Sequence, residues 1–101
     1  EKPARYIIPT AMRAKHYLIR GDVQGVGYRY FTKGVAERLG VKGFVRNLHT
    51  GEVEVVAEAD DVTLNLFKVE LERGPRMARV TGIVEKDLPQ SGTYSSFLIR
   101  G

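Results

Sequence analysis

Stretches typical of strands and of helices alternate along this chain, and their order restricts the possible folds more than any other feature. The strand-like stretches are residues 14–20, 43–48, 52–59, 78–86 and 94–100, and the helix-like stretches are residues 28–39 and 61–73. Gly40 stands where a helix C-cap belongs, and "HTG" before the third strand predicts a hairpin with Gly51 in its turn. The order β-α-β-β-α-β, with a short fifth C-terminal strand, predicts an α+β ferredoxin-like sandwich: one antiparallel sheet with two helices on one face.

Residues 61–73, "DVTLNLFKVELER", fit two patterns. The apolar residues of the first half alternate as in a strand, whereas Leu64, Phe67 and Leu71 have helical spacing. Two aspartates at the start suit a helix N-terminus, and Gly74 followed by a proline suits a helix end. We therefore predict a helix here.

Length and composition fit a small globular protein. The chain has 101 residues, 43% of them hydrophobic, which suits one domain with one modest core. No run is long enough for a membrane span, and residues 1–13 lack the unbroken apolar stretch of a signal peptide. The absence of cysteine excludes disulfides and thiolate chemistry and is compatible with the cytoplasm. We expect a cytoplasmic monomer without membrane contact, with a poorly ordered tail over residues 1–13 and one domain over residues 14–101.

The stretch "GDVQGVGYR", residues 21–29, joins the first strand to the first helix. Its glycines allow successive backbone amides to surround an anion, and the helix N-terminus adds partial positive charge. Arg29 lies in the first helical turn, where a cation is unfavourable unless an anion compensates for it. The formal net charge of +4 also favours anionic ligands. We predict a phosphate-binding loop that comprises Val23, Gln24, Gly25, Val26, Gly27 and Arg29.

Two better known phosphate-binding loops do not fit this stretch. It lacks the GxxxxGK[ST] pattern of a Walker A loop, and its glycine spacing differs from the Rossmann fingerprint. Two helices in about 100 residues also leave no room for a dinucleotide domain. A turn without any ligand is the remaining alternative, since glycine is common wherever a strand meets a helix.

Asn47 is the second candidate, at the end of the strand "GFVRNL". An asparagine near a hairpin turn often serves only the turn. However, the strand before the first helix and the strand after it can lie side by side in such a sheet. Asn47 would then reach the anion site with an amide that both donates and accepts hydrogen bonds.

Two motifs in these stretches resemble those of the acylphosphatase family, and the resemblance covers residues 14–101. The first motif, G-x-V-Q-G-V-x-[F/M]-R, is matched at Gly21, Val23, Gln24, Gly25, Val26 and Arg29. The second, G-[aromatic]-x-x-N-x-x-x-G-x-V, is matched at Gly43, Phe44, Asn47, Gly51 and Val53. Tyr28 departs from the usual phenylalanine or methionine, and Ala59 from a common glycine.

The resemblance implies hydrolysis of the carboxyl–phosphate bond of small acyl phosphates to a carboxylate and inorganic phosphate, with no metal or other cofactor. It implies that Arg29 binds the phosphoryl oxygens and that Asn47 positions the attacking water. Because a cradle of amides with an arginine recognises tetrahedral oxyanions, we also expect inorganic phosphate to inhibit competitively. Such a substrate has a good leaving group, so positioning and charge stabilisation suffice and no histidine is required. We interpret His16 as a strand surface residue and His49 as a turn residue.

Two alternatives remain open at this point. One keeps the fold and the phosphate loop without activity, as a regulatory domain or as a piece of a larger carbamoyl-phosphate-handling protein. The other is a nucleic-acid-binding module, because "KGFV" at residues 42–45 resembles the start of an RNA-recognition signature. The basic residues are spread along the chain and not collected in a stripe, so we expect no nucleic-acid partner.

Overall fold

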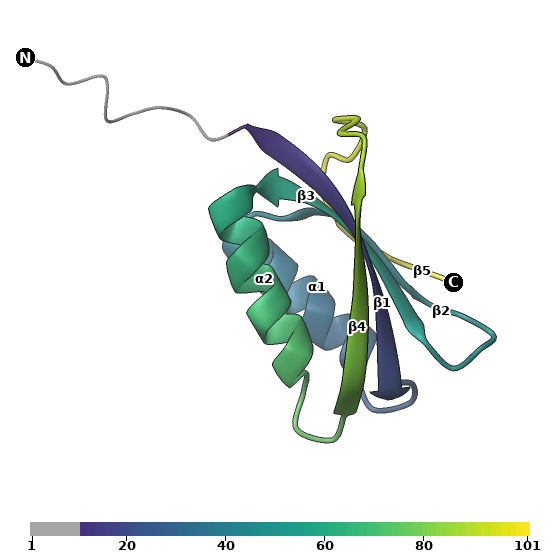
Figure 1. Ribbon diagram of the computed structural model, residues 1–101. Helices are drawn as coiled ribbons and strands as arrows, with labels where there is room; N and C mark the ends of the chain where they lie inside the picture. The colour runs from purple at the N-terminus through teal and green to yellow at the C-terminus, as the bar shows by residue number, and fades with distance from the viewer. Residues whose placement is uncertain (1–10) are drawn as a thin grey trace, which may run out of the picture.

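A computed structural model describes residues 11–101 as a sheet of five strands with two helices against one of its faces (Figure 1). In chain order the elements are β1 (Met12–Asp22), α1 (Tyr28–Leu39), β2 (Lys42–Asn47), β3 (Val53–Asp60), α2 (Asp61–Arg73), β4 (Arg79–Leu88) and β5 (Phe97–Arg100). The predicted elements and their order are therefore confirmed. The tail predicted over residues 1–13 lies mostly outside the described residues, and β1 already includes Met12 and Arg13.

The strands lie in the order β4-β1-β3-β2-β5, and four of them pair antiparallel. The last strand differs from the prediction of a wholly antiparallel sheet, because β5 pairs parallel with β2. The reason is topological. After β4, at one edge of the sheet, the chain crosses to the opposite edge and reverses direction once, so β5 runs the same way as β2.

The expectation that β1 and β2 lie side by side is also wrong, since β3 lies between them. Both strands pair antiparallel with β3, so they run in the same direction, and their C-terminal ends lie on the same side of the sheet. Val53 is the register partner of Ile19 in β1 and of Asn47 in β2. The end of β2 is thus brought level with the end of β1 across one intervening strand.

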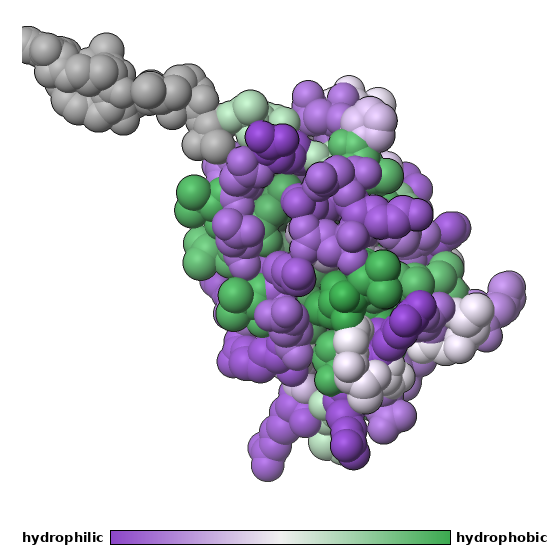
Figure 2. Space-filling model, viewed as in Figure 1, coloured by the Kyte–Doolittle hydropathy of each residue, from purple (hydrophilic) through white to green (hydrophobic). Residues whose placement is uncertain are grey.

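The core lies between the sheet and the two helices. On α2, Leu64, Phe67 and Leu71 are buried, which confirms the helical spacing. The strand-like alternation at its start arises because Val62 and Leu66 lie on the exposed side of the helix. Figure 2 shows apolar surface on this side of the molecule, where α2 lies. The side chain of Asp60 caps the helix by accepting a 2.8 Å hydrogen bond from the backbone N–H of Thr63.

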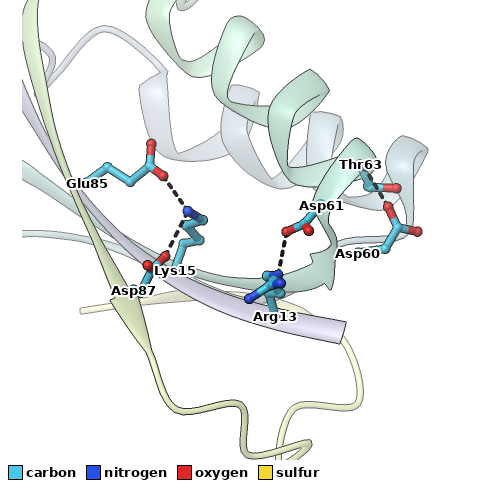
Figure 3. Close-up of polar contacts among 7 residues, drawn as sticks. All are labelled: Arg13, Lys15, Asp60, Asp61, Thr63, Glu85 and Asp87. Atoms are coloured by element: carbon cyan, nitrogen blue, oxygen red, sulfur yellow. Dashed lines mark hydrogen bonds and ion pairs between the residues drawn. The ribbon is translucent and has the colours of Figure 1, made fainter. Parts of the chain in front are cut away.

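Ion pairs connect β1, β4 and α2, and Figure 3 shows those of Lys15 with β4 and of Arg13 with Asp61 of α2. Lys15 Nζ lies 2.6 Å from Glu85 and 2.8 Å from Asp87, and Lys68 of α2 lies 2.8 Å from Glu85. Hydrogen bonds from Lys15 and Lys68 hold the pKa of Glu85 below its ordinary value. Bonds to Asp87 and Glu85 raise the pKa of Lys15. The network therefore favours the charged form of both carboxylate and ammonium.

Neither of the two helices in residues 11–101 is long and apolar enough to cross a bilayer.

Candidate active site

The loop that the sequence predicts to bind phosphate connects the end of β1 at Asp22 to the start of α1 at Tyr28. Gly25 and Gly27 have φ angles of 75° and 80°, in the left-handed region that favours glycine. Gly27 is the N-cap of α1 and provides no side-chain cap, and the first turn of the helix holds no acidic residue. The N–H groups at this helix start are therefore left for an external acceptor, and the helix dipole favours an anion there.

A pocket of about 100 Å³ opens at this helix start. Its lining consists of Val23, Gly25, Gly27, Tyr28, Arg29, Tyr30 and Asn47. The structure thus brings together both predicted side chains and three of the loop residues, although Arg29 and Asn47 come from different elements. Gln24 and Val26, which the prediction included, are not in the lining.

Arg29 contributes the positive charge of the pocket. It is half-buried and has no carboxylate partner within residues 11–101. Four other arginines in residues 11–101 do have one: Arg13 pairs with Asp61, Arg20 with Glu52, Arg46 with Glu54 and Arg73 with Glu70. Arg29 is therefore a cation beside a helix N-terminus, where an anionic ligand would be stabilised by both.

Asn47 contributes an acceptor. It ends β2 on the same side of the sheet as the core residue Val53, its register partner, and this is the side that the helices cover. Its Oδ1 atom is buried and has no hydrogen-bond partner within the described chain. A buried acceptor without a partner is costly, by about 1–3 kcal/mol. The arrangement suits a group in the pocket that donates a hydrogen bond to Asn47, and water can do so.

The side chain of Gln24 has a role that sequence reasoning missed. Its Nε2 atom donates hydrogen bonds of 2.8 Å to the backbone oxygen of Leu48 and 2.9 Å to that of Glu52. Both acceptors belong to the turn between β2 and β3, directly after Asn47. Gln24 thus connects the glycine-rich loop to the hairpin that carries the second site residue. The only sequence signal was its place within the first motif.

Tyr28, the departure from the first motif, is a core residue with a polar contact. It is 1% exposed, and its hydroxyl donates a 2.7 Å hydrogen bond to the backbone oxygen of Leu71 at the end of α2. Burial raises the pKa of this hydroxyl. The aromatic contact expected at this position is present, and the hydroxyl adds a link between the two helices that phenylalanine would lack.

The pocket lining contains no histidine, aspartate or glutamate. His16 lies in β1, where its Nε2 is 2.9 Å from Glu54, and His49 is exposed in the turn after β2, as the sequence predicts. Residues 11–101 contain no group of three or more potential metal ligands among histidine, aspartate and glutamate side chains. What the pocket offers is therefore one cation, one amide and backbone N–H groups.

Two other hollows in the described part of the chain are less suited to an anion. One is lined by Met12, Arg13, Ala14, Asp87, Leu88 and Gln90, and the other by Glu72, Val80, Thr81, Gly82 and Ile83. Each contains a carboxylate, and Arg13 in the first is already paired with Asp61. The pocket at Arg29 has no carboxylate in its lining and is therefore the best suited of these three to an anion.

Comparison with known proteins points to one family. A protein-family model described as Acylphosphatase matches residues 15–99. The chain is 46% identical over 85 residues to an acylphosphatase of Pseudomonas paraeruginosa (strain DSM 24068 / PA7). The aligned region covers 84% of this chain and 92% of that protein. The crystal structure of acylphosphatase from Bacillus subtilis superposes with a TM-score of 0.85 at 28% identity, over 90% of this chain and 100% of that one. A T. kodakarensis HypF structure has a TM-score of 0.78 at 30% identity and covers 88% of this chain but only 12% of its own.

Proposed function

The chain belongs to the acylphosphatase family and has that type of enzyme activity, and from this premise we propose how its site works. Its substrates are small acyl phosphates, and its products are a carboxylate and inorganic phosphate. We propose that Arg29 binds the phosphoryl group and that Asn47 positions the attacking water. The observation that carries this assignment is that both side chains line one pocket at a helix N-terminus.

In the proposed reaction a water oxygen bonds to phosphorus while the bond from phosphorus to the carboxyl oxygen breaks. Negative charge spreads over the phosphoryl oxygens as this happens, and a guanidinium with backbone N–H groups stabilises it. Arg29 can bind two of these oxygens at once, because its N–H groups form a planar fork. The amides from Val23 to Gly27 are proposed to complete the cradle.

Asn47 is suited to hold the water because its buried Oδ1 lacks a protein partner in residues 11–101. An oxygen that accepts a hydrogen bond from the water fixes where the water's lone pair points, which is the positioning that catalysis requires. The proton of the water is proposed to go to a phosphoryl oxygen of the substrate. The lack of an acidic or histidine side chain in the pocket lining favours this route.

We propose that neither a metal nor another cofactor takes part. The charge of one phosphoryl group can be balanced by Arg29 and the start of α1 together, each of which favours an anion. The carboxylate is a good leaving group, so no Lewis acid is needed to activate it.

The enzyme is proposed to have no nucleic-acid partner. In RNA-recognition domains the aromatic residue of the "KGFV" signature stacks on a base from the open face of the sheet. Here Phe44 is only 7% exposed, and the guanidinium of Arg100 lies 4.2 Å from its ring centroid. The ring is covered by the protein itself, which argues against base stacking. We further propose that the protein is a monomer and that it is cytoplasmic, a location with which the absence of cysteine is compatible.

Hydrolysis of benzoyl phosphate tests the proposed site. The rates of the wild-type chain, of Arg29→Ala and of Leu66→Ala are compared, since Leu66 is exposed on α2 and does not line the pocket. We expect the rate of hydrolysis to fall in Arg29→Ala and to stay at the wild-type value in Leu66→Ala. A full rate in Arg29→Ala would show that the phosphoryl group binds elsewhere.

A further inference from the structure

The pocket is large enough for the reacting phosphoryl group and little else. Its volume is about 100 Å³, whereas pockets that enclose a whole small-molecule ligand typically measure about 300–1,000 Å³. A phosphoryl group with its attacking water suits a space of this scale better than a whole substrate does. The acyl part of the substrate must therefore lie outside the pocket, against whatever forms its rim.

Tyr30 is the large, mostly exposed residue among those that line the pocket. It is 74% exposed, whereas Tyr28, two residues earlier in the same helix, is 1% exposed. The other lining residues offer glycine backbone, the buried Val23, or the two polar groups assigned to phosphate and water. An apolar or aromatic group at the rim has Tyr30 as its evident contact.

No aromatic pair and no side-chain hydrogen bond within the described chain holds this ring. Aromatic pairs join Tyr28 with Phe31 and Phe44 with Tyr94, among others, but Tyr30 belongs to none of those in residues 11–101. Its hydroxyl also has no hydrogen-bond partner within these residues. A ring so exposed contributes little to the core, so its position beside Arg29 is the feature that calls for an explanation.

We propose that Tyr30 contacts the acyl group of the bound substrate and gives the enzyme a preference for acyl phosphates with aromatic or other bulky apolar acyl groups over acetyl phosphate. The proposal rests on the assignment of the phosphoryl group to Arg29. A ring at the rim gains from stacking and from burial of apolar surface only when the acyl group is large enough to reach it. The contact exists in both the bound substrate and the transition state, so its effect falls mainly on KM.

The test compares benzoyl phosphate and acetyl phosphate as substrates of the wild-type chain and of Tyr30→Ala, Tyr30→Phe and Leu66→Ala. In Tyr30→Ala the ratio of kcat/KM for benzoyl phosphate to that for acetyl phosphate is expected to fall by about threefold to tenfold, the scale of one aromatic contact. The fall should come from a higher KM for benzoyl phosphate. Tyr30→Phe keeps the ring and should keep the wild-type ratio, as should the distant Leu66→Ala.

The outcomes separate this proposal from the assignment of the site. Equal losses for both substrates in Tyr30→Ala, with an unchanged ratio, would overturn the acyl contact and leave the role of Arg29 standing. A wild-type ratio in Tyr30→Ala without any loss would overturn it as well. If the inhibition constant of inorganic phosphate is also higher in Tyr30→Ala, Tyr30 acts at the phosphoryl group, which contradicts the proposal. Full activity of Arg29→Ala would instead contradict the proposed site and the inference that rests on it.

Discussion

The side-chain amide of Gln24 donates a 2.8 Å hydrogen bond to the backbone oxygen of Leu48, the residue that follows Asn47. Through this contact the loop before α1 and the end of β2 hold each other in place. The two halves of the site, the loop that follows β1 and the end of β2, come from parts of the chain whose strands are not neighbours in the sheet. The distance between Arg29 and Asn47 thus depends on links such as this one, and catalysis is sensitive to displacements of about 1 Å.

Gln24→Ala should therefore lower activity more than stability. We expect kcat to fall by about tenfold or more, because a misplaced reacting group is costly. The free energy of unfolding should fall by only about 1 kcal/mol, the scale of one or two hydrogen bonds, since Leu48 and Glu52 retain backbone donors at their oxygens. Enzyme kinetics and urea unfolding measure the two effects. Gln90→Ala, an exposed glutamine outside the site, is the matched control. An unchanged kcat in folded Gln24→Ala would mean that the link does not hold the site together.

Glu85→Gln should weaken the protein in a pH-dependent way. The two lysines hold the pKa of Glu85 below its ordinary value of 4.5, so the folded state favours its charged form. The stabilisation is complete above pH 4.5 and is lost as the pH falls through the lower folded-state pKa. We expect a loss of about 1 kcal/mol near neutral pH, the scale of a partly exposed ion pair.

The measurement is urea unfolding of wild type and Glu85→Gln at several pH values. The difference between them should shrink toward zero in acid. Glu72→Gln provides the control, because Glu72 is exposed on α2 and forms no ion pair within the described residues. A difference that is the same at neutral and acid pH would show that packing, and not charge, is responsible.

Local patterns in the sequence predict the elements of this fold well. The bounds of α1 were predicted at Tyr28 and Leu39 because apolar spacing and the flanking glycines agree there. Local pattern did not predict two features of the sheet, because both depend on how distant segments pair. These are the position of β3 between β1 and β2 and the parallel pairing of β5.

The site, too, was predictable only where local sequence motifs carry the information. Arg29 and Asn47 are visible as motif residues, and the structure places them in one pocket. The contacts of Gln24 join it to residues 24 and 28 positions later in the chain, so they need the folded register. Tyr28 occupies a position of the first motif and Tyr30 does not, but no sequence signal marks Tyr30 as a rim residue, which is shown by its exposure in the structure.

Activity should survive removal of metal ions. Arg29 and the start of α1 supply the positive charge, and the described residues contain no cluster of metal-ligating side chains. The wild-type chain is treated with an excess of EDTA, desalted and assayed with benzoyl phosphate, and the rate should stay within about twofold of the untreated enzyme. A large loss that Mg²⁺ restores would contradict the proposed mechanism, because part of the phosphoryl charge would then be balanced by an ion.

Inorganic phosphate should inhibit competitively against benzoyl phosphate. A cradle of amides with an arginine recognises tetrahedral oxyanions by charge and shape, so product and substrate occupy the same pocket. Sulfate should inhibit by the same mode but more weakly. Initial rates over a grid of substrate and inhibitor concentrations, at constant ionic strength, measure the mode. Purely non-competitive inhibition would place the anion at a site other than the pocket of Arg29.

The last prediction separates the two proposed roles, beginning with Arg29. This residue is proposed to contact phosphoryl oxygens in the bound substrate and in the transition state. Arg29→Ala should therefore weaken phosphate binding and also lower kcat by ~10³ or more, the scale of an arginine at a transferring phosphoryl group. Phosphate affinity is measured by calorimetry or by protection against unfolding, which does not require activity. The variant should remain folded, since Arg29 has no ion pair in the described residues to lose.

Asn47 is proposed to act on the water, which matters only as attack begins. Asn47→Ala should leave phosphate affinity nearly intact while kcat falls by about 10² or more, as for the loss of one preorganised polar group. A fall in kcat without a change in ground-state binding identifies an interaction made in the transition state. Stability should not suffer from a lost bond at Oδ1, because that buried atom has no protein partner within residues 11–101. If phosphate binding is lost as severely as in Arg29→Ala, Asn47 is a phosphate ligand and the water-positioning role is wrong. If kcat is unchanged, Asn47 serves the hairpin turn alone, and another group orients the water.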